Sequence, residues 1–304
     1  MIKSITVTNP SGEELKLTLA NPELSEGMAV GPATGLGPVK ATVNTTTVAR
    51  MDGVVFNSAR VGARNIVLPL VFVGGDIETI RQKTYKYFPV KKQVKLVIET
   101  DNRLVETYGH VEANETNIFS KEASTQVSII CDSAFLASSG PNGIVATQFY
   151  STTPMFQFPF ANESLVTKLL NFGHIDLDTT KAVVYDGDLE VGMTVYIQFS
   201  GAVTGLKIHN LTTGEFLSIN STIVNTLTGS PFKTGDSIII TTSKGNKSIT
   251  LYRNSVAYNI MNALGLSPKW LTLVKGLNEI AVAADVGVDK IQVLVENRVL
   301  YEGL

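Results

Sequence analysis

Cysteine is almost absent from this sequence, since Cys131 is the only one among 304 residues. A single cysteine cannot form an internal disulfide, so we expect the chain to be made in a reducing cytoplasm. Cys131 ends an alternating run in which it shares one face with Val127 and Ile129. This position predicts a buried small side chain and not a nucleophile.

Charge is also scarce. Charged residues make up 17% of the sequence and the formal net charge is −2, whereas a nucleic-acid-binding protein normally carries a basic patch. No apolar run approaches the roughly 20 residues of a membrane-spanning helix, and the N-terminus lacks the basic, apolar and small-residue order of a signal peptide. We therefore expect a soluble, unsecreted chain with no nucleic-acid site and no membrane partner.

Sequence motifs for catalysis and metal binding are missing as well. The three histidines stand in separate elements, at His110, His174 and His209. Four aspartates gather at Asp176, Asp178, Asp186 and Asp188, but their spacing matches no EF-hand loop. No Gly-x-Ser-x-Gly elbow, Walker loop or dinucleotide fingerprint is present. We expect no catalytic residue, no cofactor and no metal site, and hence no enzyme.

One amphipathic helix stands out in a sequence that otherwise reads as strands. Asp76 is placed to cap its first turn, and Pro89 stops it. The face expected to pack inward consists of Ile77, Ile80, Thr84, Tyr87 and Phe88. From Val94 the apolar period changes to two, and Asp101-Asn102 supplies a turn before the return strand. The pattern predicts a helix followed by an antiparallel hairpin.

The length and the many short alternating runs predict a mainly β chain of two domains. The small-residue, Pro and Gly stretch Ala137 to Gly143 predicts the linker, which gives domains 1–138 and 142–304. An opening hairpin is expected around the turn at residues 9–12, with Leu19 ending its second strand, and further strands at Lys40 to Val48 and Asn65 to Val73. Turn signals at sandwich-like spacing separate the surest strands of the second domain, which are 194–199, 206–209, 216–219, 237–242, 248–252, 279–283 and 291–296. A short helix is expected at Val256 to Leu264.

Two sets of residues are candidates for binding. The first lies in the loop from Ser25 to Pro38 and consists of Gly31, Pro32, Gly35, Leu36, Gly37 and Pro38. This loop is either a plain solvent loop or a backbone arm laid against a neighbouring subunit. The second set is Tyr252 and Trp270, whose rings are either core residues or platforms on which a sugar stacks.

Several segments together carry a family resemblance. In the first half they are Ile77 to Lys92, Glu99 to Glu112 and Asn117 to Leu136. In the second half they are Asn162-Glu163, Ile208-His209-Asn210, Trp270 with Leu273, Leu277 to Ile280, and Val299 to Leu304. These segments resemble the distal tail proteins of long-tailed, siphovirus-type phages and of related tail-like particles.

The resemblance implies a structural protein at the distal end of the virion tail. It implies an N-terminal β-sandwich-like domain with one helix that closes a ring, generally a homohexamer, and a galectin-like C-terminal β-sandwich. The implied partners are the tail tube protein, the tail-tip hub or fibre protein, and receptor-binding or other baseplate proteins. Two alternatives stay open: a lectin-like adhesin that holds a cell-wall glycan, and an enzyme on cell-wall polymer, which would need two carboxylates about 5 to 10 Å apart.

Overall fold

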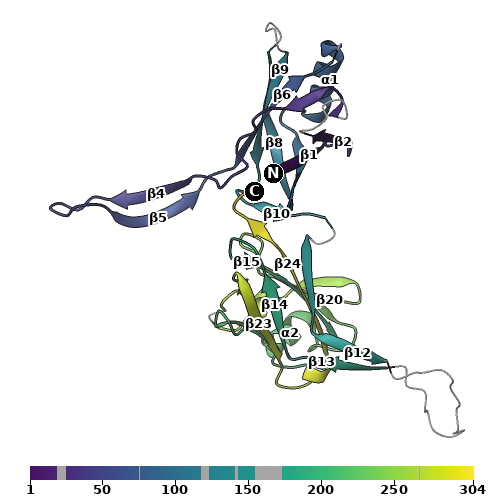
Figure 1. The fold of residues 1–304 in the computed structure, drawn as a ribbon. Helices are drawn as coiled ribbons and strands as arrows, with labels where there is room; N and C mark the ends of the chain where they lie inside the picture. Colours follow the sequence, from purple (N-terminus) through teal and green to yellow (C-terminus); the bar gives the residue numbers. More distant parts are fainter. Residues whose placement is uncertain (19–24, 75, 118–122, 141–142, 155–172, 267) are drawn as a thin grey trace, which may run out of the picture. The chain divides into compact units, whose positions relative to one another are not determined.

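A computed structural model describes residues 1–18, 25–74, 76–117, 123–140, 143–154, 173–266 and 268–304. The chain is mainly β, as predicted, and divides into two compact units (Figure 1). The first unit comprises Met1–Gly143 together with Leu300–Leu304, and the second comprises Ile144–Val299. The predicted residues Leu19, Asn162 and Glu163 lie outside the described residues.

The first unit is built on one antiparallel sheet. Its strands are β1 (Ile2–Thr8), β2 (Glu14–Thr18), β3 (Met28–Val30), β6 (Asn65–Phe72), β7 (Gln93–Thr100), β8 (Leu104–Asn117), β9 (Ser124–Cys131), β10 (Leu136–Ser138) and β25 (Leu300–Tyr301). The order is β2-β1-β7-β8-β9-β6-β3, and β10 pairs with both β8 and β25. The end strands β2 and β3 approach each other. The sheet therefore curls around its own core.

Alternation along the strands builds that core. In β7, Val94, Leu96 and Ile98 are buried while their neighbours are not. Strand β7 pairs antiparallel with β8, which confirms the predicted hairpin. Cys131 is also buried, as expected, and burial raises the pKa of its thiol.

Helix α1 (Ile77–Tyr87) begins where the sequence predicts. The Asp76 carboxylate accepts a hydrogen bond from the Thr79 amide at 3.2 Å, so the predicted N-cap is confirmed. Ile80, Thr84, Tyr87 and Phe88 are buried, but Ile77 is 45% exposed. The placement of Ile77 on the packed face was wrong, because this first residue of the helix is exposed to solvent.

A separate hairpin projects from the first unit (Figure 1). Strands β4 (Ala41–Thr46) and β5 (Val55–Val61) pair only with each other, in a two-stranded sheet. We call residues 41–61 the arm. The sequence predicted the first of its strands but not the second.

The second unit has two main antiparallel sheets. The six-stranded sheet contains β11 (Ile144–Gln148), β24 (Ile291–Arg298), β16 (Thr194–Phe199), β19 (Ser237–Thr241), β20 (Ser248–Arg253) and β21 (Val256–Asn259). The four-stranded sheet contains β14 (Thr180–Tyr185), β23 (Gly276–Ala283), β17 (Lys207–Asn210) and β18 (Glu215–Ser218). Short pairs are formed by β12 (Tyr150–Pro154) with β13 (Gly173–Leu177) and by β15 (Val191–Gly192) with β22 (Thr272–Leu273). All seven strands predicted as surest are present, and alternate burial in both sheets is the pattern of a β-sandwich.

Two helical predictions in the second unit need correction. The helix expected at Val256 to Leu264 is wrong, because Asn254 and Ser255 take positive φ values and turn the chain back into strand β21. Only one short 3-10 turn follows, η2 (Met261–Ala263), and another, η3 (Val288–Lys290), precedes β24. Helix α2 (Ser221–Thr228), capped by Asn220 and ended by Gly229 in the left-handed conformation, was not predicted.

The linker prediction also changes. Ala137 and Ser138 lie in β10, so the stretch that was expected to be free of strand begins inside the first sheet. The last five residues, expected with the second domain, pack with the first unit. No helix in the described part of the chain is long and apolar enough to cross a membrane.

Candidate interaction surfaces

The potential metal ligands of the described residues lie apart from one another. Among them, no three or more His, Cys, Asp or Glu side chains are grouped closely enough to hold a metal ion. His110 lies 3.1 Å from Asp132 at an exposed position, and His209 stacks on Phe216.

The Gly31–Pro38 segment lies along strand β6 of its own unit. The Gly31 amide donates to the Pro69 carbonyl at 2.7 Å, and Thr34 forms a bridge with Val67. Leu36 is buried in the core. Gly35 has a φ of +83°, and a Cβ there would sit 1.9 Å from the Asn65 carbonyl oxygen, so only glycine fits. The segment is held in place, and its contact with a neighbouring subunit stays a prediction.

A fully buried arginine organises this segment. Arg64 donates from Nη1 to the carbonyls of Gly35 (2.5 Å) and Gly37 (2.9 Å), and from Nε to the Ala134 carbonyl (3.0 Å). Its Nη2 donates to the Glu302 carbonyl at 2.6 Å. No carboxylate among the described residues pairs with it, and burial lowers the pKa of its guanidinium. Backbone carbonyls alone therefore compensate this buried charge.

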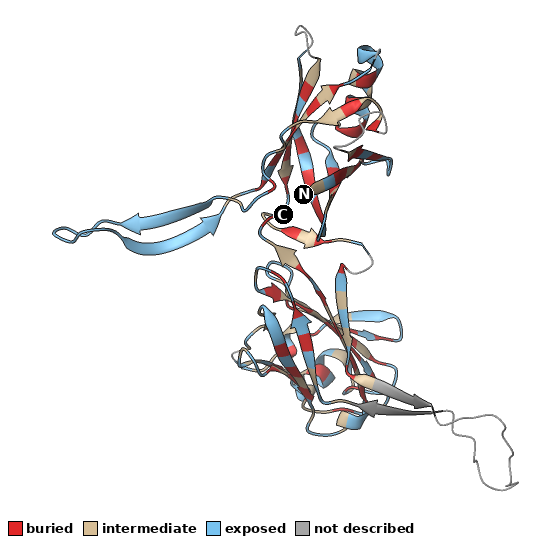
Figure 2. Ribbon diagram, viewed as in Figure 1, coloured by how far each residue is buried: buried red, intermediate tan, exposed pale blue. Residues whose placement is uncertain are grey.

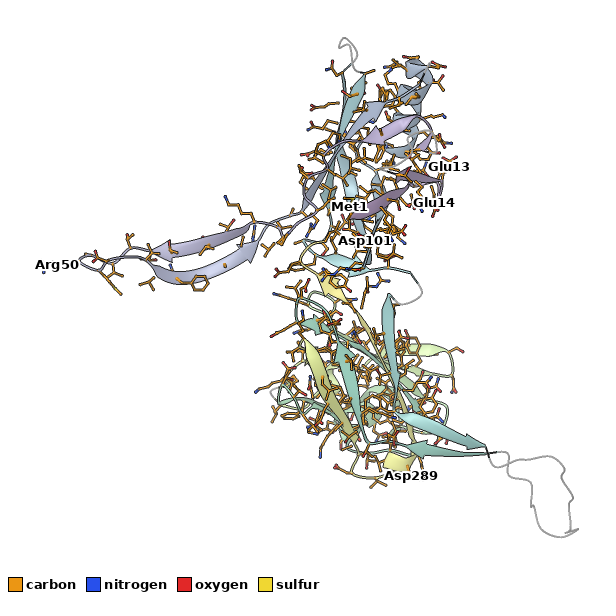
Figure 3. All side chains as sticks on the ribbon, in the orientation of Figure 1. Met1, Glu13, Glu14, Arg50, Asp101 and Asp289 are labelled. Atoms are coloured by element: carbon orange, nitrogen blue, oxygen red, sulfur yellow. The ribbon has the colours of Figure 1, made fainter. Side chains whose placement is uncertain are left out.

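Every residue in both strands of the arm is exposed (Figure 2). Phe56 is 63% exposed and Val43 53%, and the other exposed apolar residues of the arm and its turn are Val48, Met51, Val54, Val55 and Val61. Arg50 lies at the tip (Figure 3). An isolated two-stranded hairpin is marginally stable in water, and no further strand of the described residues pairs with the arm.

The arm has two unlike faces. Cross-strand partners share a face, and the pairs Ala41–Val61, Val43–Ala59 and Thr45–Phe56 make one face largely apolar. The pairs Thr42–Arg60, Asn44–Ser58 and Thr46–Val55 make the other face mostly polar, with Val55 as its one apolar member. The Asn44 amide donates to the Ser58 hydroxyl on this face at 3.0 Å. A register irregularity between Asn44 and Thr45 brings Phe56 to the apolar side.

Hollows in the described surface occur in both units. One, about 630 Å³, is in the first unit and is lined by Met1, Ile2, Leu36, Gly37, residues 100–103 and Leu304. A second, about 210 Å³, is lined mainly by apolar side chains of β1, β2, β3 and the residues after β3. The third, about 380 Å³, lies in the second unit, is lined by polar residues at the start of α2, and includes Lys207 and Asp285.

The two candidate sugar-stacking residues lie on different elements of the second unit. Tyr252 is on β20 and is 40% exposed. Trp270 precedes β22 and is half-buried, with the Lys247 ammonium 5.1 Å from its ring centroid. Neither residue lines any of the three hollows. Their role in sugar binding stays a prediction.

Two protein-family models match the chain in series. A phage tail protein RIFT-related domain matches residues 12–130, and a siphovirus-type tail component, C-terminal domain, matches residues 186–297. The first match falls in the first unit and the second in the second unit. The chain belongs to the siphovirus distal tail protein family. It is a structural component of a phage tail.

One solved structure with a TM-score above 0.5 shares the fold of this chain. The crystal structure of Dit (gp 19.1) of phage SPP1, described as a paradigm of the hub adsorption apparatus in phages that infect Gram-positive bacteria, is similar at a TM-score of 0.62 and 14% identity, over 97% of this chain and 99% of that one. A chain of the phage P2 baseplate in its activated conformation with Ca gives a TM-score of 0.46 and 13% identity, over 98% of each chain. No curated protein matches the sequence.

Sequence reasoning missed two features of this distal tail protein. Only the first strand of the arm was predicted and not its hairpin, although Asp52-Gly53 between two β-rich runs is a strong hairpin signal. Arg64 carried no signal at all, because its partners are backbone carbonyls from three distant segments. The candidate intersubunit loop, Gly31 to Pro38, lies just before the arm in the sequence, in the segment that Arg64 binds.

Proposed function

We propose that this distal tail protein forms a closed ring, a homohexamer, at the distal end of the tail, and that the arm of each copy lies on the next copy. The observation that carries the proposal is the apolar face of an arm that its own unit leaves uncovered. An apolar element that docks elsewhere on an identical chain makes a head-to-tail contact, and such contacts close into rings when the rotation allows it.

The expected partners and localisation rest on the family to which the chain belongs. The ring would join the tail tube protein on one face to the tail-tip hub or fibre protein on the other, with receptor-binding or other baseplate proteins docking on the second unit. The chain would be made in the host cytoplasm and would catalyse no reaction. The family match and the SPP1 relative, which belongs to a hub adsorption apparatus, support this role. A cell-wall hydrolysis assay that shows turnover would overturn the non-catalytic part.

Electron microscopy and mass photometry test the ring. We expect six-fold rings of the wild-type protein, or of its tail complex, and loss of the ring in the double variant Val43→Lys/Phe56→Lys. The matched control, Thr42→Lys/Ser58→Lys, adds the same charge to the polar face and should keep the ring. Both variants alter only exposed positions, so both should fold. A monomer at high concentration, with no ring in the assembled particle, would refute the proposal.

Glycan binding by the second unit is the alternative function. The exposed Tyr252 ring favours it, whereas Trp270 is partly covered by Lys247. In a binding assay against cell-wall polysaccharide, Tyr252→Ala should then abolish binding while a distant variant, Tyr85→Ala on helix α1, should not. Equal binding by the wild type and Tyr252→Ala would remove this alternative.

A further inference from the structure

Residues 300–304 are bound to the first unit in the way that proteins bind extended peptides. Strand β25 adds to β10 through the pairs Leu136–Tyr301 and Ala137–Leu300. The Leu304 amide donates to the Leu36 carbonyl at 3.1 Å. The Tyr301 and Leu304 side chains pack on the core. Main-chain pairing combined with apolar anchors is the strand-addition mode of peptide recognition.

Two arginines donate hydrogen bonds to the backbone carbonyls of this segment. The Arg103 guanidinium lies 4.2 Å from the Tyr301 ring centroid, and its Nη1 donates to the Gly303 carbonyl at 3.0 Å. The buried Arg64 donates to the carbonyl of Glu302, whose own side chain is exposed. The segment is therefore held through a tyrosine ring and consecutive carbonyls, and the Glu302 side chain takes no part.

The same Arg64 also holds the chain where it enters the arm. Gly35 and Gly37, whose carbonyls it binds, precede β4, and Arg64 itself follows the last residue of β5, Val61, by three positions. We call residues 35–40 and 62–64 the root of the arm. Gly303 packs directly on this root, since a Cβ at Gly303 would lie 2.8 Å from the Gly37 carbonyl carbon. The chain entering the arm, the chain leaving it and the 300–304 segment thus all contact the Arg64 region.

We propose that the first unit carries a peptide-binding groove, filled by the chain's own residues 300–304, and that its occupancy fixes the root of the arm and with it the direction in which the arm projects. The effect on ring assembly rests on the proposed function. The groove and its effect on the root do not.

A larger side chain at position 303 tests the proposal in the full chain. Gly303→Val places methyl groups against the backbone of Gly37 and Pro38, which cannot move aside as a flexible side chain would. We expect hydrogen exchange in residues 31–40 and 62–67 to accelerate by roughly tenfold or more, the factor that corresponds to losing a hydrogen bond to a charged group. The matched control, Glu302→Ala, keeps the carbonyl that Arg64 binds and should exchange like the wild type.

A synthetic peptide provides a second, independent test. A chain ending at Val299 should bind the fluorescein-labelled peptide Leu-Tyr-Glu-Gly-Leu saturably in an anisotropy titration, and binding should restore slow exchange at the root. The same peptide with alanine in place of tyrosine should bind at least about tenfold more weakly, because it loses the ring under Arg103. If the shortened chain does not fold, Gly303→Val alone decides.

The outcomes separate this inference from the ring. Wild-type exchange at the root of Gly303→Val would overturn the inference, even if the wild type forms rings. Absence of rings in the wild type, together with fast exchange in Gly303→Val, would overturn the ring and leave the groove standing. Loss of rings in Gly303→Val with retention in Glu302→Ala would support both.

Discussion

Each unit of the chain buries one arginine, and the two are compensated differently. Arg253 in the second unit pairs with the buried carboxylate of Asp236, donating from Nε at 2.9 Å and from Nη2 at 2.5 Å. It also donates to the carbonyls of Ser230 and Pro231 after helix α2. The bonds to Asp236 raise the pKa of Arg253. Arg64 in the first unit has carbonyl partners only, so its surroundings supply dipoles and no counter-charge.

Breaking the pair in the second unit should be costly. We expect Arg253→Met to lower the free energy of unfolding by about 3 to 5 kcal/mol, because it leaves the Asp236 charge buried without its partner. Trp270 is the only tryptophan and lies in the second unit, so its fluorescence in a urea titration reports this unit. The double variant Arg253→Met/Asp236→Leu should lose less than Arg253→Met alone, since no charge is then stranded.

An exposed ion pair of the same unit provides the control. Lys207 and Asp285 lie 3.1 Å apart at the surface, and Lys207→Met should change stability by no more than about 1 kcal/mol. Equal losses in Lys207→Met and Arg253→Met would show that burial of the pair does not matter.

At the scale of the element, helix α1 offers a test by pH. Hydrogen bonds from the side chain and the amide of Thr79 hold the pKa of Asp76 below its ordinary value. The capping contribution is therefore complete above the ordinary aspartate pKa of about 3.9 and is lost as the pH falls through the lower pKa of the folded state. Asp76→Asn keeps a capping oxygen that does not titrate.

The measurement is amide exchange of helix α1 between pH 7 and pH 3, corrected for intrinsic rates. The wild-type helix should lose protection relative to Asp76→Asn in the acid part of this range, while at pH 7 the wild type should be at least as well protected. Parallel curves for the two proteins would contradict a role for the ionised cap. Glu78, which also lies in the first turn, is the same in both.

The elements that sequence reasoning recovered are those whose signals are local. The Asp76 cap, the alternating strand β7 and strand β16 follow from neighbours within a few residues. Residues 256–259 were misread because their helix-like apolar spacing was outweighed by the turn at Asn254-Ser255, which pairs them with β20. Helix α2 was missed because Thr and Ile lower helix propensity, although Asn220 and Gly229 mark its two ends.

The candidate site was harder to predict than the fold. The apolar face of the arm depends on a register irregularity that no local pattern announces. The groove depends on Arg64 meeting a carbonyl 238 residues away, and backbone carbonyls carry no sequence signature. The Gly31–Pro38 prediction stays a prediction. Small residues there allow the close backbone approach at Gly35, but the pattern did not indicate the hairpin that follows.

At the scale of the whole chain, the second unit is inserted into the first. The first unit is interrupted after Gly143 and resumes at Leu300. Ile144 and Arg298, near the two ends of the second unit, are partners in the β11–β24 ladder, which places their Cα atoms about 5 Å apart. The two points at which the chain passes between the units are therefore neighbours.

This insertion predicts that the first unit is self-sufficient. Replacing residues 144–299 with a flexible linker of about four residues, which spans up to roughly 13 Å, should leave a folded first unit that still assembles. Circular dichroism and mass photometry would check both. A chain that folds but no longer assembles would show that the second unit contributes to the ring contact.

The groove filled by residues 300–304 also sets an order of events during synthesis. After Arg64 is made, the ribosome adds 238 residues up to and including Glu302, which takes about 10 to 50 s at typical bacterial and eukaryotic elongation rates. Throughout that interval the nascent first unit has an incomplete sheet and an arginine that lacks one acceptor. The root of the arm is therefore completed only after the whole second unit has been translated. In the proposed ring, this would delay the moment at which one nascent copy can bind the next.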